Sequence, residues 1–280
     1  MKIGVSSYSF NKHRRQSGCT YVEMCRMAKE MGFDAIEFIN LEAEDPIKEA
    51  CAIRQECDAL GLDISAYTVG ADLLRADYEQ TRANLFFCID VAEALGAPLL
   101  RHDVCYSLPE GMDWMQAVDV MVPRIREITA YAKAKGIRTC SENHGYIFQD
   151  SVRVKTLIDR VDDENYRWLV DIGNFLCVDE DPMEAIKVAA PYAIHVHAKD
   201  FLYKMKAENP VAPTNFFGTR NGNFLRGTIV GHGAVPVAAC VDYLRKSGYD
   251  ATLSLEFEGM EDNLPALDAG GRYLRALVEA

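Results

Sequence analysis

The sequence has little positive charge, few histidines and only two tryptophans. Its 280 residues carry 30 Lys and Arg against 42 Asp and Glu, so the formal net charge is −12 with the six histidines counted as neutral. Because a chain this acidic repels a phosphate backbone, broad binding of nucleic acid is disfavoured and we expect no nucleic-acid partner.

Long apolar runs and paired cysteines are also absent. No stretch approaches the roughly 20 apolar residues that span a bilayer, and the start MKIGVSSYSF is unlike a signal peptide. The nine cysteines include no C-x-x-C pair, which argues against a zinc-knuckle spacing and a disulfide framework. We therefore expect a cytoplasmic protein without a membrane partner, whose cysteines mostly fill the core in a reducing compartment.

No linker or low-complexity segment divides the chain, and one unit recurs along it. The unit is an amphipathic helix, a glycine and a short apolar strand, as in CRMAKEMGFDAIEF and AYAKAKGIRTCSENHG. The glycine stands where a helix C-terminus needs a left-handed residue, at Gly32, Gly61, Gly96, Gly136 and Gly248. Such a repeat predicts strands that alternate with helices in a parallel sheet.

Eight strands are predicted, with a last helix over about 262–279; the strands lie near residues 2–6, 34–38, 62–69, 97–103, 137–142, 166–171, 192–198 and 251–257. Eight such units in this length favour an α/β fold closed into a (β/α)8 TIM barrel, a single domain over residues 1–280. The longest interval between strands, 199–250, contains aromatic, Asn and Arg residues, and we expect it to form an ordered flap over the barrel mouth.

Polar residues stand at the ends of these strands. In a (β/α)8 barrel the active site forms at the C-terminal strand ends, where this sequence has Glu37, His102, Glu142, Asp171, His195, His197 and Glu256. Strand alternation predicts that His195 and His197 face the barrel interior while Ile194 faces the helices. Glu256 is placed inward by the same rule, and Glu142 and Asp171 can be.

Three carboxylates and one imidazole would then converge from neighbouring strands, namely Glu142, Asp171, His197 and Glu256. Like charges so close repel strongly in a pocket of low dielectric unless a cation neutralises them. The set predicts one divalent metal ion as cofactor, for which we expect Mn²⁺, with Mg²⁺, Co²⁺ and Zn²⁺ as alternatives.

The motifs SENHG, DIGN, HVHAKD and LSLEFEG, in this order, resemble those of the xylose isomerase-like TIM-barrel family of sugar and sugar-phosphate isomerases and epimerases, within the superfamily of AP endonuclease family 2. The resemblance implies that Glu142, Asp171, His197 and Glu256 bind one divalent metal. It also implies that Glu142 and Glu256 are the catalytic acid and base, as in epimerases such as D-tagatose 3-epimerase. Such a pair would remove and return an α-proton through a metal-stabilised enediolate.

Further residues near the mouth are candidate substrate contacts: Glu37, His102, His144, Asn174, His195, Lys199 and His232. For several, a second role stays open. His195 could instead hydrogen-bond within the barrel, His144 could orient Glu142, and Lys199 could pair with Asp200. His232 precedes a helix whose N-terminal amides could hold an anion, or it belongs to an ordinary turn that begins the helix.

Two positions depart from the family pattern, because Asn174 and Tyr203 stand where sugar epimerases carry a His and an Arg that hold substrate. We therefore expect a metal-dependent isomerase or epimerase of a sugar or sugar derivative, whose identity and phosphorylation stay open. The alternative is a dehydratase or lyase acting on a keto-sugar or keto-inositol. An AP endonuclease is a remote alternative, because Tyr67 and Asn174 replace histidines that it would need. The expected partner is a small sugar-like substrate, and a homo-oligomer stays open.

Overall fold

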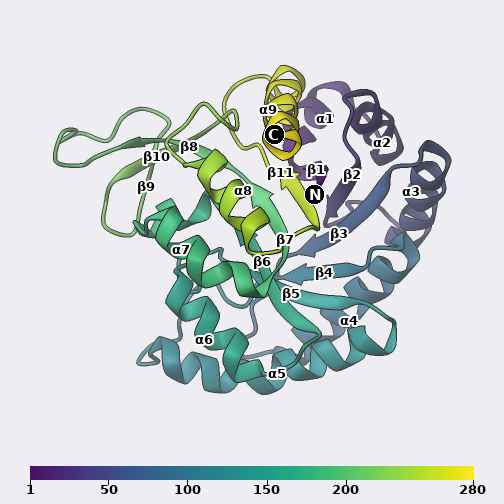
Figure 1. The fold of residues 1–280 in the computed structure, drawn as a ribbon. Coiled ribbons are helices and arrows are strands. Elements are labelled where there is room, and N and C mark those ends of the chain that lie inside the picture. The colour runs from purple at the N-terminus through teal and green to yellow at the C-terminus, as the bar shows by residue number, and fades with distance from the viewer.

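Eight parallel strands close into a barrel in the computed structural model, which describes residues 1–280 (Figure 1). The last barrel strand pairs with the first, with Lys2 opposite Thr252. The strands are β1 (Lys2–Ser6), β2 (Ala35–Ile39), β3 (Asp63–Val69), β4 (Leu99–His102), β5 (Arg138–Glu142), β6 (Tyr166–Asp171), β7 (Ala193–Ala198) and β11 (Thr252–Leu255). Each strand end lies within two residues of its predicted position, and the (β/α)8 TIM barrel is confirmed.

Helices surround the barrel and connect its strands (Figure 1). They are α1 (Asn11–Ser17), α2 (Tyr21–Glu30), α3 (Pro46–Leu60), α4 (Tyr78–Leu95), α5 (Trp114–Ala134), α6 (Ser151–Val161), α7 (Pro182–Ala189), α8 (Val237–Lys246) and α9 (Asn263–Glu279), with 3₁₀ segments η1 (Ser7–Phe10), η2 (Asn174–Val178) and η3 (Ala190–Tyr192). None of the helices combines the length and apolar character needed to cross a membrane.

Local signals in the sequence account for the helix boundaries. Asp45 and Asp77 precede α3 and α4, and each carboxylate accepts the amide N–H of the third helical residue. Gly61 and Gly96 end the same two helices in the left-handed conformation, with φ of 59° and 75°. A side chain is strained in that conformation, so glycine sets where the chain leaves the helix and turns into the next strand.

Apolar residues pack on both sides of the barrel wall. A cluster of 68 buried residues includes the helix faces and the strand residues that meet them. A separate cluster of four lies inside the barrel, formed by Ala66, Leu99, Cys140 and Leu169. Ile194 packs against this inner cluster, although strand alternation predicts that it faces the helices. The pairing of β6 with β7 skips Ile194, which makes it the extra residue of a β-bulge and turns it inward.

Within the interval 199–250, residues 200–228 form an ordered projection beside the barrel rather than a flap over its mouth. Three antiparallel strands build it, β8 (Asp200–Lys204), β9 (Phe217–Gly218) and β10 (Phe224–Thr228), and Figure 1 shows them extending away from the barrel. Thr219 and Arg220 attach it by hydrogen bonds to Asp179 at 2.8 Å and Asp150 at 2.9 Å. No residue of 200–250 lines the cavity at the mouth, so the expected order is present but the expected position is not.

Candidate active site and metal centre

Strand register brings four of the predicted residues together at the C-terminal end of the barrel. Glu142 and Asp171 are the last residues of β5 and β6. His197 lies opposite Asp171 in the β6–β7 pairing, and Glu256 directly follows β11. Donor atoms of these four residues all lie within 4.8 Å of one another. Three carboxylates and one imidazole therefore share one small volume.

These four side chains are almost entirely removed from water. The exposed fraction is 0% for Asp171, 2% for His197, 3% for Glu142 and 12% for Glu256. Burial of ionised carboxylates is costly unless cations compensate the charge. The site therefore depends on whatever positive charge lies close by.

Two cations of the chain supply part of that charge. Lys199 Nζ lies 2.6 Å from Glu256 Oε2 and 3.2 Å from Asp171 Oδ2. Arg101 Nη2 lies 2.5 Å from Glu142 Oε2 and 3.0 Å from Asp103 Oδ1. Each of the two glutamates thus has one cation of its own.

These cations decide the ionisation of the glutamates. Burial raises the pKa of Glu142, but Arg101 and His197 together outweigh burial, so the pKa lies below its ordinary value. Burial opposes ionisation of Glu256 as well, yet Lys199 and His197 hold its pKa well below the ordinary value. Burial prevails in Asp171, whose pKa rises to about 6. Both glutamates are therefore anions at neutral pH, as a metal ligand or a general base must be.

The residues present fit a divalent metal ion. Asp171 Oδ2 and both ring nitrogens of His197 are buried without a hydrogen bond and have only ion-pair contacts, whereas buried polar atoms are normally hydrogen-bonded. His197 Nδ1 lies 3.8 Å from Glu142 Oε1 and 3.6 Å from Glu256 Oε2, a separation that an ion with ligand distances of about 2.0–2.3 Å would bridge. Three oxygen donors and one nitrogen suit several divalent ions and do not choose among them.

A cavity of about 230 Å³ opens onto these residues. It is lined by Tyr8, Ile39, Asn40, Thr68, Val69, Gly70, Arg101, Glu142, His144, His197, Lys199, Glu256 and Glu258. Ligand pockets usually measure about 300–1,000 Å³ and are mostly apolar. This one is smaller and has a largely polar lining, which suits a small polar molecule.

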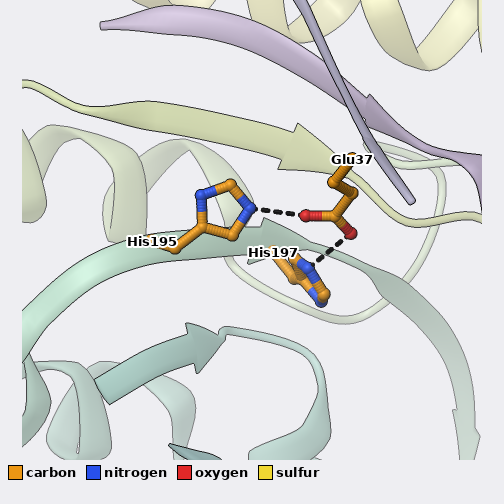
Figure 2. A group of neighbouring side chains, drawn as sticks. All are labelled: Glu37, His195 and His197. Carbon is orange, nitrogen blue, oxygen red and sulfur yellow. Dashed lines mark hydrogen bonds and ion pairs between the residues drawn. The ribbon is translucent and has the colours of Figure 1, made fainter. Parts of the chain in front are cut away.

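Glu37 and His195, two of the candidate substrate contacts, do not line this cavity. Glu37 Oε2 lies 2.5 Å from His195 Nε2, and Glu37 Oε1 lies 2.8 Å from Nε2 of His197 (Figure 2). Burial raises the pKa of Glu37, but the charges of His197 and His195 outweigh it and hold the pKa well below its ordinary value. Of the two roles that the sequence leaves open for His195, the structure shows hydrogen bonding inside the barrel.

Asn174 and Lys199 lie within the site. Asn174 Nδ2 donates to Glu142 Oε1 at 3.0 Å, and its Oδ1 lies 3.4 Å from Lys199 Nζ. Lys199 pairs with the site carboxylates rather than with Asp200, the alternative partner considered from the sequence. These contacts hold the Glu142 carboxylate between Asn174 on one oxygen and Arg101 on the other.

His144 lies at the edge of the site. Its Nδ1 is 2.9 Å from Asp103 Oδ1, and its side chain is 42% exposed, in the lining of the cavity. Asp103 also pairs with Arg101, which contacts Glu142. His144 therefore reaches Glu142 only through two intervening side chains, and its exposed face is free to meet a ligand.

His102 and His232 are not brought to the site. The His102 ring stacks on Tyr166, with centroids 6.1 Å apart, on the side of β4 opposite Arg101. His232 is exposed in the loop before α8. The Asp200 carboxylate accepts the backbone N–H groups of Gly231, Gly233 and Val235 in that loop, so the anion held there belongs to the protein itself.

Sequence reasoning missed Arg101 and Asp103. Arg101 is only 9% exposed and contacts both Asp103 and Glu142. The β4 strand has four residues, LLRH, so alternation permits either Arg101 or His102 to face inward. The orientation follows from Leu99, which belongs to the inner cluster. Arg101 is two residues further along β4, so it lies on the same inward face of the strand. Only the packed barrel shows that.

Comparison with known proteins agrees with this geometry at the level of the fold. Residues 25–277 match the family model described as xylose isomerase-like TIM barrel. Similar solved structures include an L-ribulose 3-epimerase, with a TM-score of 0.76, 18% identity, and coverage of 99% of this chain and 94% of that chain. The probable 3-DHS dehydratase AsbF from Bacillus anthracis has a TM-score of 0.75 and 20% identity, over 98% of this chain and 99% of that chain.

A third similar structure contains a metal. It is a xylose isomerase-like TIM barrel protein from Mycobacterium smegmatis in complex with magnesium, with a TM-score of 0.73, 18% identity, and coverage of 99% of this chain and 96% of that chain. The comparison with curated proteins gave no match. At these identities the solved structures establish the shared fold alone.

Proposed function

Because the chain belongs to the xylose isomerase-like TIM barrel family, we propose that it is a divalent-metal-dependent isomerase or epimerase of a sugar or sugar derivative. The observation that carries the proposal is the convergence of Glu142, Asp171, His197 and Glu256 on a small polar cavity. A protein that only binds a ligand has no need of a buried, oxygen-rich metal set that includes two ionised glutamates.

In the proposed reaction Glu142 and Glu256 are the acid and base. They reach the cavity from β5 and from the end of β11, and both carboxylates are ionised at neutral pH. One would accept the α-proton of the substrate, and the other would return a proton to the opposite face or to the neighbouring carbon. A divalent ion, when bound, supplies the positive charge that stabilises the enediolate left behind.

Neighbouring side chains position the two glutamates. Arg101 and Asn174 hold the two oxygens of Glu142, which fixes the plane of the carboxylate. Lys199 holds Glu256 at 2.6 Å and can also donate to a substrate oxygen, since its ammonium lines the cavity. Holding reacting groups in place in this way lowers the barrier before any chemistry takes place.

Similar structures named as sugar epimerases support this proposal, and they include L-ribulose 3-epimerase and D-psicose 3-epimerase from Clostridium cellulolyticum H10. For the metal we propose Mn²⁺, with Mg²⁺, Co²⁺ and Zn²⁺ as alternatives. The magnesium in one similar structure supports a hard divalent ion at such a site.

Lys199 favours one second candidate, a metal-dependent dehydratase of a keto-sugar or related keto compound. Elimination needs a proton for the departing hydroxyl group, and the Lys199 ammonium lies in the cavity beside Glu256. Asn174 and Tyr203 also replace the His and Arg that hold sugar in epimerases. The similarity to a probable 3-DHS dehydratase supports this candidate. Both reactions would begin with removal of the same α-proton.

Solvent-deuterium incorporation tests the proposal and separates the two candidates. The Mn²⁺-loaded protein is incubated in D₂O with a panel of ketoses, ketose phosphates and keto-inositols. We expect deuterium at the carbon next to the carbonyl of at least one compound, together with an epimer or isomer. An unsaturated, ultraviolet-absorbing product would assign dehydration instead. The proposed function fails if the loaded protein exchanges no proton in any compound.

A further inference from the structure

Glu37, His195 and His197 form a chain of contacts inside the barrel, on the side of His197 away from the four-residue set. Glu37 is completely buried, and the side chains of His195 and His197 are each 2% exposed. Figure 2 shows one oxygen of Glu37 directed at each ring, with Oε2 2.5 Å from His195 Nε2 and Oε1 2.8 Å from His197 Nε2. The three residues come from strands β2 and β7, which are not neighbours in the barrel.

The distances identify this group as a chain of polar contacts rather than a second metal site. Two donors bound to one ion at about 2.0–2.1 Å lie roughly 2.9–3.4 Å apart in octahedral or tetrahedral geometry. The Glu37–His195 separation of 2.5 Å is shorter than that and is a charge-assisted hydrogen bond. Nothing else that could bind a metal completes the group, since it contains one carboxylate and two rings.

The His197 ring has one nitrogen on each side of this arrangement. Nε2 faces Glu37, while Nδ1 faces Glu142 and Glu256 at 3.8 and 3.6 Å. A neutral imidazole has one N–H donor and one lone pair, and the partner of the donor decides which nitrogen is free. The negative charge of Glu37, whose Oε1 lies 2.8 Å from Nε2 in an ion-pair contact, favours the proton of a neutral ring on Nε2, which leaves the lone pair on Nδ1, facing the carboxylates.

We infer that Glu37 and His195 are positioning residues, which hold the His197 ring so that its Nδ1 is presented to the metal. Glu37 sets the orientation and tautomer of His197, and His195 occupies the second oxygen of Glu37 so that the carboxylate cannot rotate away. Metal-binding histidines commonly donate their other nitrogen to a carboxylate, and such partners tune metal affinity. The inference rests on the proposed metal-dependent function and replaces the substrate contact expected for both residues.

The β-bulge in β7 explains why the His195 side chain can reach Glu37. Because β7 carries the extra residue Ile194, both Ile194 and His195 turn inward, the first to the apolar cluster and the second to Glu37. His195 also lines a separate cavity at the N-terminal end of the barrel. It therefore lies between that cavity and Glu37, and it does not line the active-site cavity.

Calorimetric titration of the full-length, metal-free protein with Mn²⁺ tests the inference. Glu37→Gln should weaken Mn²⁺ binding by about 10–100-fold, the usual effect of losing such a partner. His195→Leu, which removes the donor to Glu37, should weaken it less. His195→Gln keeps an N–H donor and should restore most of the affinity. Leu169→Val, a control in the inner cluster opposite His195, should bind as the wild type does.

A double variant shows whether His195 acts on metal binding through Glu37 or independently of it. If His195 acts through Glu37, the variant with both Glu37→Gln and His195→Leu should bind Mn²⁺ no more weakly than Glu37→Gln alone. Fully additive losses would overturn that part of the inference. Thermal unfolding of each variant shows whether it is folded, and the pair His195→Leu and His195→Gln decides the question if Glu37→Gln does not fold.

Proton NMR of the metal-free protein gives a readout that is independent of metal. A His197 Nε2–H directed at Glu37 should give a downfield, exchange-protected signal that persists in His195→Leu, which removes the other ring donor, and disappears in Glu37→Gln. Wild-type protein that binds no Mn²⁺ would contradict the proposed function. Wild-type affinity in Glu37→Gln, or an unchanged downfield signal, would instead overturn the positioning role.

Discussion

A cavity with a charged lining lies at each end of the barrel, and the two cavities differ in how far their charged side chains are exposed to water. The N-terminal cavity is the larger, about 620 Å³ against about 230 Å³. Its lining includes Lys2, which pairs with Asp63 while the two side chains remain 60% and 53% exposed. At the C-terminal end, Lys199 pairs with Asp171 while their side chains are 6% and 0% exposed.

This difference in exposure shows that buried charge without full compensation identifies the candidate active site better than the volume of a cavity does. An exposed ion pair contributes about 0–1 kcal/mol and needs no further explanation. Buried charges cost much more, and a fold retains them where they serve another purpose. The smaller cavity is lined by two cations that face several carboxylates, and Asp171 and His197 beside it have buried atoms without a hydrogen bond.

The largest effect should come from the two glutamates. Glu142→Gln and Glu256→Gln should each lower turnover by about 10²–10⁴-fold, because an amide can still coordinate a metal but cannot carry the proton. Metal content is measured in the same samples. Asp63→Asn at the N-terminal end is the matched control and should keep wild-type turnover. The two-glutamate mechanism is excluded if either glutamate variant retains full turnover with metal bound.

Loss of a buried cation should come next. Arg101→Met leaves Glu142 and Asp103 without their guanidinium and should lower the free energy of unfolding of the metal-free protein by about 3–5 kcal/mol. Arg54→Met, at the exposed N-terminal cavity, should change it by less than about 0.5 kcal/mol. Urea denaturation measures both. Equal losses in the two variants would remove the distinction between the two ends.

Metal affinity should depend on pH through His197. Burial lowers the pKa of His197, but Glu37 and Glu256 raise it well above its ordinary value. The metal-free ring therefore holds its extra proton below that raised pKa, and a metal at Nδ1 must displace it. Mn²⁺ affinity should rise about tenfold per pH unit around neutrality and level off only above the raised pKa.

Calorimetry in two buffers of different ionisation enthalpy measures the protons released on Mn²⁺ binding. We expect about one. His144→Ala, which alters a cavity residue outside the four-residue set, should leave the count unchanged. Binding without proton release would show that His197 is already neutral in the metal-free protein.

The smallest effects on kinetics are expected for two histidines, His144 and His232, which are both candidate substrate contacts in the sequence. His144 lines the cavity, so His144→Ala should raise KM a few-fold and leave kcat nearly unchanged. His232 is exposed on a distant loop, and His232→Ala should change neither constant. Steady-state kinetics on the substrate identified by deuterium exchange measures both. A larger effect for His232 would mean that the loop before α8 approaches the site during turnover.

The sequence alone determined the architecture and the main donors of the site. Glycine-terminated helices and short apolar strands recur at a spacing that only a few folds accommodate, and parallel strands place their C-terminal residues at one end. Strand-end placement gave seven candidates, and the neighbouring strands together with the family motifs singled out Glu142, Asp171, His197 and Glu256 among them. Their donor atoms lie within 4.8 Å of one another in the structure.

Tertiary structure decided which neighbours complete the site. Whether Arg101 or His102 faces inward depends on the phase of a four-residue strand, and Ile194 and His195 both face inward only because of a bulge. Glu37 meets His195 across the barrel, a contact between residues 158 positions apart in sequence. The hydrophobic period and the spacing of motifs reflect interactions over a few residues. Which distant side chains meet depends instead on barrel closure and on the pairing register, and both are fixed only when the strands pack.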